Sequence, residues 1–262
     1  MKKTVYLLFA AAIFAVSCSS NDDTTNAETP ATGDTSYVPL TTGSYWVYDV
    51  PGSIESGRDS LYIANDTIIG ANTYKKFKTK DAPFGFYSSA LNDNGVRKIG
   101  DKIVVTGSTA LSFSEAVPFT IGVSDLVIFK ESAQNNEVLS NITGTITQNY
   151  QGIPIIIDYI LTTTAKADVA SLTVNSQTYT NLKTVETAVS LTISSTVGTV
   201  TFPLVDNQNI VTSTQYYAEN IGAVKTVTDF HYQISQLIAT QFNIPASSNQ
   251  HQEELLVRYN VE

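Results

Sequence analysis

Apolar and polar residues alternate with a period of two along much of this chain. The alternation is strict in residues 189–194 and 199–202, and it returns at the C-terminus, where Leu255, Val257 and Tyr259 share one face. Successive side chains of a β-strand point to opposite faces, so this pattern predicts strands that each bury one face. The chain is therefore expected to be an all-β protein.

One eleven-residue pattern occurs twice. Residues 69–79 read "IGANTYKKFKT" and residues 174–184 read "VNSQTYTNLKT". Small and amide residues suit a tight turn, and Tyr74 or Tyr179 then begins a new strand. A tyrosine at such a position usually packs its ring, so we interpret the pattern as a structural hairpin rather than as a binding element.

A second partial match follows each hairpin. Residues 87–100 and 215–227 each combine an aromatic strand with a polar turn that ends in glycine. The order of turns and strands predicts a meander of antiparallel hairpins that is used twice. The approximate repeats are residues 37–135 and 136–262.

The predicted architecture is an extended antiparallel meander sheet built from these two repeated units. It is either curved, like an unclosed barrel, or folded into two layers, with at most one or two short helices. Residues 229–243 offer the helix, with Asp229 as its N-cap, although Tyr232 and Ile234 also fit the start of a strand.

Two apolar segments are candidates to face a ligand. Ile155, Ile156 and Ile157 are consecutive and Leu161 follows them, so this strand is either central or lines a hydrophobic concavity. Trp46, the only tryptophan, is expected to anchor the core; the alternative is a platform on which a sugar stacks.

Residues 1–17 have the parts of a secretory signal peptide, with two lysines, an apolar run and small residues before Cys18. The run covers residues 5–16, so as a helix it reaches about 18 Å. A hydrocarbon core of about 30 Å is too thick for it to span. The sequence "AVSC" before and at Cys18 resembles a bacterial lipobox, in which the cysteine is acylated. The alternative is an ordinary signal peptide with a chance cysteine.

The segment after the signal has a different composition from the rest. Residues 18–36 contain the lipidated cysteine and then an acidic, Thr- and Ser-rich stretch, which we interpret as a flexible tether. Residues 37–262 are rich in tyrosine and β-branched residues and are expected to form a single all-β domain.

Charge and cysteine content exclude several functions. The formal net charge is −9, and removal of residues 1–17 with their two lysines leaves 13 basic and 24 acidic residues, or −11. Such a domain would be repelled by nucleic acid. If Cys18 carries lipid, no thiol remains for a disulfide, a nucleophile or a metal site.

The residues give no catalytic set. His231 and His251 lack the spacing of a metal site. Glu253 and Glu254 are adjacent, so in a strand they point to opposite faces and cannot act together on one bond. We therefore expect no enzyme activity, no cofactor and no metal.

Three segments resemble outer-membrane lipoproteins of Bacteroidota, most of which have no assigned function. They are "YVPLTTGSYWVYDV" at residues 37–50, "DSLYIANDTIIGANTYKKF" at residues 59–77 and "YYAENIGAVKTV" at residues 216–227. The resemblance implies location and fold far more than activity. Asp22 and Asp23 also resemble the acidic signal that exports such lipoproteins to the cell surface; the alternative is a solvated linker.

The same resemblance suggests a modification. Asp-Ser/Thr-apolar tripeptides are O-glycosylated in exported Bacteroidota proteins, and three similar tripeptides here would place sugar on Thr24, Ser60 and Thr67.

Three functions follow as hypotheses. The first is a lipid-anchored, non-enzymatic binding or interaction module of the outer membrane, favoured at the cell surface, with a membrane complex or a glycan as partner. The second is a periplasmic carrier of a lipid or other hydrophobic ligand, of the unclosed-barrel type. The third is a glycan-active surface protein, which would need two carboxylates facing each other across a cleft.

Overall fold

The structure is a computed structural model that describes residues 36–52, 56–112, 118–150, 152–197 and 199–261. Every described residue belongs to one compact unit, Asp34–Glu262. Cys18 and Thr24 lie outside the described residues. Within them, no helix has the length and apolarity needed to cross a membrane.

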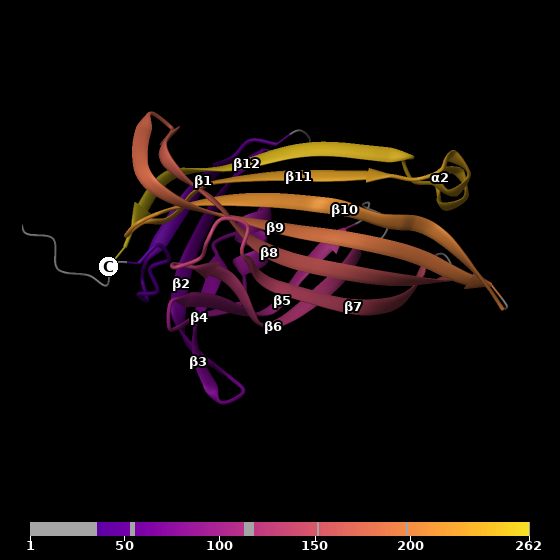
Figure 1. Ribbon diagram of the computed structural model, residues 1–262, viewed down its shortest axis with the longest axis horizontal. Coiled ribbons are helices and arrows are strands. Elements are labelled where there is room, and N and C mark those ends of the chain that lie inside the picture. Colours follow the sequence, from indigo (N-terminus) through magenta and orange to yellow (C-terminus); the bar gives the residue numbers. More distant parts are fainter. Residues whose placement is uncertain (1–35, 53–55, 113–117, 151, 198, 262) are drawn as a thin grey trace, which may run out of the picture. The chain divides into compact units, whose positions relative to one another are not determined.

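The described residues form one antiparallel sheet of twelve strands and two short helices (Figure 1). The strands are β1 (Tyr45–Val50), β2 (Gly57–Ile69), β3 (Asn72–Thr79), β4 (Gly95–Ile99), β5 (Lys102–Ser112), β6 (Pro118–Lys130), β7 (Val138–Tyr150), β8 (Ile153–Val174), β9 (Gln177–Val197), β10 (Val200–Ala218), β11 (Gly222–Gln233) and β12 (Ser247–Asn260). The helices are α1 (Phe86–Leu91) and α2 (Gln236–Phe242). The all-β prediction is confirmed.

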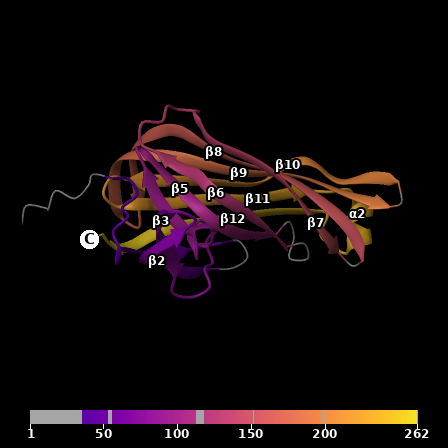
Figure 2. The same ribbon diagram turned by 90° about the horizontal axis from the view of Figure 1, so that it is seen from below.

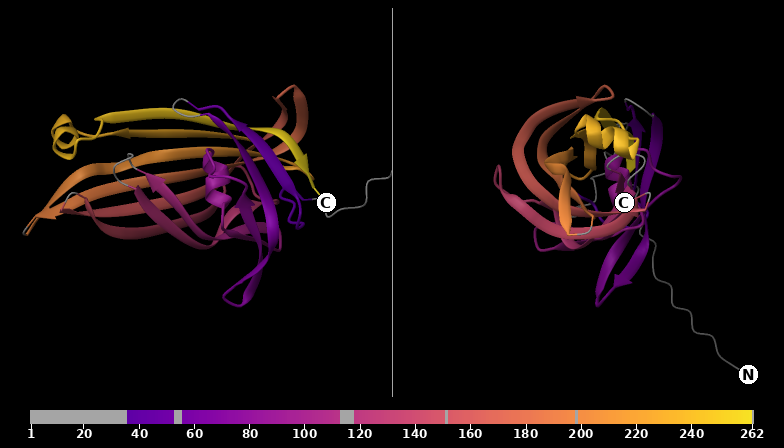
Figure 3. Two further views of the ribbon diagram at one scale, coloured as in Figure 1. Left: turned by 180° about the vertical axis from the view of Figure 1, so that it is seen from behind. Right: turned by 90° about the vertical axis from the view of Figure 1, so that its right-hand side faces the viewer.

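The strand order shows how the sheet is assembled. It runs β6-β5-β4-β3-β2-β1-β12-β11-β10-β9-β8-β7, so every ladder joins consecutive strands except the one between β1 and β12. Two six-stranded meanders, β1–β6 and β7–β12, are thus joined by the first and last strands. The sheet curls until it is nearly closed (Figure 3), which confirms the curved form of the prediction.

The two edge strands, β6 and β7, meet at a seam without a backbone ladder in the described residues. The backbone N–H of Val127 in β6 donates to Ser140 Oγ in β7 at 3.0 Å, and the Val127 carbonyl accepts from Thr163 Oγ1 in β8 at 2.6 Å. Side-chain hydroxyls therefore supply the hydrogen bonds that a continuous sheet would supply from its backbone.

The two ends of the sheet differ. We call the end that holds the turn between β10 and β11 the near end and the opposite end the far end. At the near end, Ser36 exchanges two hydrogen bonds with Asn220 in that turn. The far end carries α2, the end of β9 and the start of β10 (Figures 1 and 2). Strands β8, β9 and β10 have 22, 21 and 19 residues, and they extend the sheet toward the far end.

The two Thr-Tyr hairpins form as predicted. β2 turns into β3 at Gly70, and β8 turns into β9 at Asn175 and Ser176, which both have positive φ. Tyr74 and Tyr179 are buried, which agrees with packing.

The segments after the two hairpins differ, however. Residues 86–91 form the helix α1, where an aromatic strand was expected, whereas residues 215–218 are a strand. The reason is that side chains of distant strands hold the start of α1, as described below. The proposed repeat as a whole stays a prediction.

Two further expectations need correction. α2 begins at Gln236 with Ser235 as its N-cap, not at Asp229, because β11 continues through Gln233. In β12 the inward face carries Glu254 and Leu256, whereas Val257 is 41% exposed. The more apolar face of this strand is thus the outer one, because the inner face is occupied by polar groups that bind α1.

The seam gives a first prediction. Thr163→Val keeps the shape of a fully buried side chain but removes its hydrogen bond to the Val127 carbonyl. We expect the free energy of unfolding to fall by about 1–3 kcal/mol. Thr162→Val, on the outer face of the same strand, should change it by less than about 0.5 kcal/mol. Urea unfolding of both variants measures the difference, and equal losses would contradict a role of Thr163 in closing the seam.

Candidate functional site

The site is built around α1, a six-residue helix whose N-terminal amides are bound by side chains of other strands. The backbone N–H groups of Phe84 and Gly85 donate to Asp59 in β2, at 2.9 and 2.8 Å. Those of Tyr87 and Ser88 donate to Glu254 in β12, at 2.7 and 2.9 Å. Gly85 itself, the N-cap, offers no side-chain cap. Because unpaired helix-start amides are costly when buried, the two carboxylates make α1 possible.

Two further contacts complete this anchor. The Ser88 hydroxyl donates to Glu254 at 2.7 Å. The amide side chain of Gln252 in β12 accepts from the Phe86 N–H at 3.0 Å and donates to the Phe84 carbonyl at 2.9 Å. We call Asp59, Gln252 and Glu254 the helix anchor.

Burial decides the electrostatics of the anchor. Glu254 is 1% exposed and Asp59 is 2% exposed. Loss of hydration raises the pKa of Glu254 to about 7, against the hydrogen bonds from Ser88 and Tyr87, which lower it; the negative charge of Asp59 raises it further.

A second prediction concerns Gly85. A Cβ atom added there would lie 2.2 Å from the carboxyl carbon of Glu254, so Gly85→Ala must displace the anchor. We expect a loss of about 1–3 kcal/mol in the free energy of unfolding. Gly122→Ala is the matched control, since its Cβ would have only the Gly107 carbonyl oxygen, at 3.9 Å, nearby. Similar losses for both would show that Gly85 is not a contact point.

A third prediction follows from the pKa of Glu254. In the unfolded chain this carboxyl loses its proton near pH 4.5, but in the folded protein it keeps the proton up to about pH 7. The folded state therefore binds more protons in this window, and stability falls as pH rises through it. The contribution is about 3 kcal/mol.

Glu254→Gln tests this directly, because it removes the titrating group at the same position. We expect the fall in the unfolding free energy between pH 4.5 and 7 to be much smaller in the variant than in the parent. Urea unfolding across this range gives both slopes, and parallel curves would assign the pH dependence to other groups.

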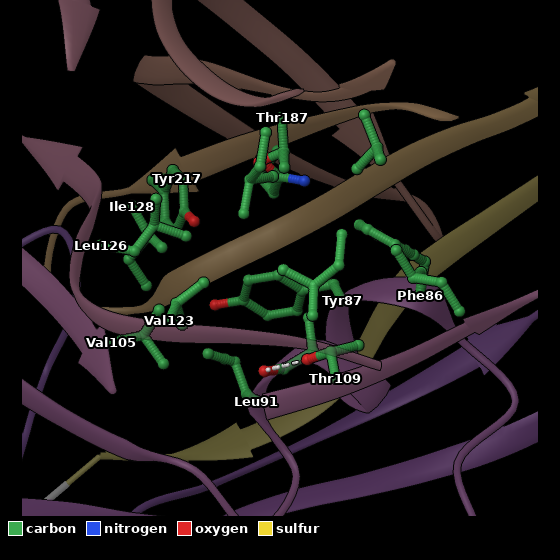
Figure 4. A pocket seen from close by; sticks show the side chains of 16 residues that line it. Phe86, Tyr87, Leu91, Val105, Thr109, Val123, Leu126, Ile128, Thr187 and Tyr217 are labelled. Carbon is green, nitrogen blue, oxygen red and sulfur yellow. Dashed lines mark hydrogen bonds between the residues drawn. The ribbon is translucent and has the colours of Figure 1, made fainter. Parts of the chain in front are cut away.

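One side of α1 forms the wall of an apolar cavity of about 80 Å³ (Figure 4). The opposite walls come from β5, β6, β8, β9 and β10. The lining residues are Phe86, Tyr87, Ala90, Leu91, Val105, Thr109, Leu111, Ile121, Val123, Leu126, Ile128, Leu161, Thr187, Val189, Gln215 and Tyr217.

The few polar groups in this lining bind one another or the backbone. Thr109 donates to the Ala90 carbonyl at 3.3 Å and Thr187 donates to Gln215 at 3.4 Å. Burial raises the pKa of Tyr87 and of Tyr217 above the ordinary tyrosine value, so both are neutral. The cavity therefore offers apolar contact and no charge.

The cavity lies directly behind the seam. Val127, the seam residue of β6, stands between Leu126 and Ile128, which line the cavity, and Leu161 lines it two residues before the seam residue Thr163. Val123 and Ile128 are half-buried. These two β6 residues of the lining are thus not fully buried.

A second, smaller cavity of about 20 Å³ lies at the far end beneath α2, with Ile155, Leu204 and Phe242 among its lining residues. α2 is fixed across this end because Tyr150 of β7 donates to the Phe242 carbonyl at 3.1 Å and stacks on its ring. The far end of the sheet is therefore closed by packed side chains.

The residues predicted to face a ligand separate into different places. Leu161 lines the first cavity and Ile155 the second, whereas Ile157 is fully buried and Ile156 is half-buried on the other face. Trp46 lines neither cavity: its indole donates to the Ile221 carbonyl and its ring stacks on Phe77.

The two predicted glycosylation positions inside the described range, Ser60 and Thr67, lie in β2 and are both half-buried. Their modification stays a prediction.

Sequence reasoning missed α1 and the helix anchor. The sequence did contain one indication of the anchor. Glu253 and Glu254 are adjacent in a strand, so one of the two acidic side chains was expected to point inward. In the structure Glu253 is on the outer face and pairs with Lys225 at 2.6 Å, while Glu254 points inward. An acidic residue in the inward row of a strand was the available sign of a buried polar partner.

The described residues hold no cluster of three or more His, Cys, Asp or Glu side chains suited to a metal ion. Asp229 pairs with His251 at 2.8 Å across β11 and β12, and both partners are more than half exposed. Asp59 and Glu254 are both engaged with backbone amides of α1.

Comparisons with known proteins do not assign a family to this chain. No family model matches the chain, and no curated protein matches it. Among solved structures the chain is similar to one described as "a putative lipoprotein from Parabacteroides distasonis ATCC 8503", with 11% identity over 86% of this chain and 99% of that chain, and a TM-score of 0.42. The description names the class that Cys18 predicts, but a likeness of this size carries no argument about the present chain.

Proposed function

We propose that this chain is a lipid-anchored, non-enzymatic binding protein of the outer membrane, and that its ligand is the apolar chain of a lipid. The observation that supports this best is the apolar cavity behind an incompletely paired seam. A ligand site of this kind needs apolar walls, which the cavity has, and an entrance, for which the gap between β6 and β7 is our candidate.

The size of the cavity sets what it holds. At about 80 Å³ it is roughly half the volume of an engineered apolar cavity, about 150 Å³, that binds benzene. It therefore takes the end of an acyl chain rather than a whole lipid. The remainder of the lipid, with its polar headgroup, would lie outside the cavity.

The anchor and the location rest on the sequence. Acylation of Cys18 would hold the protein on a membrane, and Asp22 and Asp23 support export to the cell surface over the periplasmic face. We propose that the protein is not an enzyme because the sequence offers no catalytic set. The two buried acidic residues, Asp59 and Glu254, also bind backbone amides at the start of α1.

A fourth prediction tests the cavity with a matched pair of variants. Ala90 in α1 lines the cavity, whereas Ala110 in β5 is exposed. Ala90→Leu adds three carbon atoms to the cavity wall and Ala110→Leu adds them to the surface. We expect Ala90→Leu to weaken binding of hexadecanoate at least tenfold, and Ala110→Leu to leave it unchanged.

The measurement is native mass spectrometry and calorimetry with the mature chain carrying Cys18→Ser, so that no attached lipid competes. Equal binding by both variants would exclude this cavity as the site. If the parent binds neither hexadecanoate nor dodecane, the proposed ligand class is wrong. The cavity would then be a packing defect that holds no ligand.

A further inference from the structure

The far half of the sheet contains almost no charge. Residues 138–157, 187–205 and 230–252 include no Asp, Glu, Lys or Arg, although the whole chain has 39 such residues, 15 basic and 24 acidic. Asp158 and Asp206 are the charged side chains that border these stretches in β8 and β10. Charged side chains are depleted at the centre of protein interfaces, so this half has the composition of a contact surface.

Within this half, β7 is an edge strand without protection. It ends the sheet, and its thirteen residues include no charged residue and no proline. Exposed edges normally carry a lysine, a proline or another obstacle, because their free N–H and C=O groups pair with other chains. The protruding part of β10 illustrates the rule, since residues 200–210 lie beyond its ladder with β11 and carry Pro203 and Asp206.

The inner row of β7 is only half-buried, because no strand of the described residues lies beside it on this edge. Ile142 pairs with Leu161 and Ile146 pairs with Ile157, and both partners in β8 are buried. Ile142 and Ile146 themselves are only half-buried, although they point to the same core. A further strand beside β7 would cover them.

The other side of the gap has the same character. Residues 118–124 of β6 include no charge, and Phe119 and Ile121 point into the core. β6 and β7 approach each other at the seam and run apart beyond it (Figure 1). The gap is therefore flanked by two neutral strand edges.

The polar edges decide what kind of partner fits here. An open strand edge cannot lie in hydrocarbon, where nothing satisfies its hydrogen bonds, so a bilayer is unsuitable as the occupant of β7. A polypeptide strand supplies those hydrogen bonds. A second copy of this chain is disfavoured, because each mature copy would carry a formal net charge of −11.

We infer that β7 is a strand-addition site for an extended, uncharged segment of a different protein. The added strand pairs along the free edge of β7, from Asn141 to Tyr150. Its inward residues are apolar and pack on Ile142 and Ile146, and its outward residues are neutral and polar, next to Thr143 and Thr147. The inference does not depend on an acyl chain occupying the cavity.

The test uses the full-length chain in its own cells. A photo-crosslinking amino acid replaces Thr147, which is exposed on β7, or Thr162, which lies on the outer face of β8 between two paired strands. We expect position 147 alone to give a discrete adduct. Mass spectrometry of the adduct should map it to one extended segment without charged residues. A synthetic peptide of that segment should then protect β7 amides from hydrogen exchange in the purified chain.

Thr147→Lys places a charge on the edge, and Thr162→Lys is its control. We expect Thr147→Lys to reduce protection by the peptide at least fivefold and Thr162→Lys to leave it unchanged, with both variants unfolding at the parent's urea midpoint. No adduct at position 147, an adduct within a helical or charged segment, or an adduct with a second copy would each overturn the inference. Ala90→Leu should not change peptide protection, which separates this result from that of the lipid proposal.

Discussion

The structure depends on the ladder between β1 and β12, the first and last strands of the sheet. Every other ladder joins strands that are consecutive in the chain, so without this one the described residues would form two separate meanders. Tyr48 in β1 pairs with Asp59 on one side and with Leu256 on the other. The ladder thereby brings Glu254 of β12 and Asp59 of β2 together from opposite ends of the sequence. Since these two carboxylates hold α1, the closure of the chain ends also fixes the cavity wall.

The helix anchor solves two problems that neither part could solve alone. Burying a carboxylate without partners costs several kcal/mol, and so does burying the free amides at a helix start. Here each group satisfies the other, with Asp59 binding two amides and Glu254 binding two amides and a hydroxyl. Removing one partner leaves the other buried and unpaired, so the whole arrangement is retained or lost as a unit. A six-residue helix can persist inside the sheet for this reason.

The sequence predicts those features that are local. Period-two alternation predicts the strands, and turn residues predict the hairpins at Gly70 and at Asn175. α1 could not be predicted in this way, because the backbone N–H of Tyr87 donates its hydrogen bond to a residue 167 positions further along the chain. The prediction of which face of β12 is buried was wrong for the same reason. Glu254 is polar, but it lies on the inner face because it binds the amides of α1. Likewise Leu161 was found by apolar pattern, whereas the cavity's other walls depend on how the sheet curls.

A bulge in β6 lies close to the gap between β6 and β7. β5 and β6 fall out of register at Thr106, opposite which β6 has two residues, Ser124 and Asp125. Such a bulge bends and twists its strand. Asp125 adopts a positive φ of 49° in this bulge, and its carboxylate accepts hydrogen bonds from Arg97 at 2.6 Å and from Tyr74 at 2.7 Å.

These contacts hold the bulge in place. The guanidinium of Arg97 lowers the pKa of Asp125, so the carboxylate stays ionised and keeps its partners. β6 therefore leaves the direction of β7 just before the seam at Val127. An ion pair, a tyrosine and Thr106 thus fix the bulge, which lies in β6 next to the part of the sheet where the edge of β7 is unpaired.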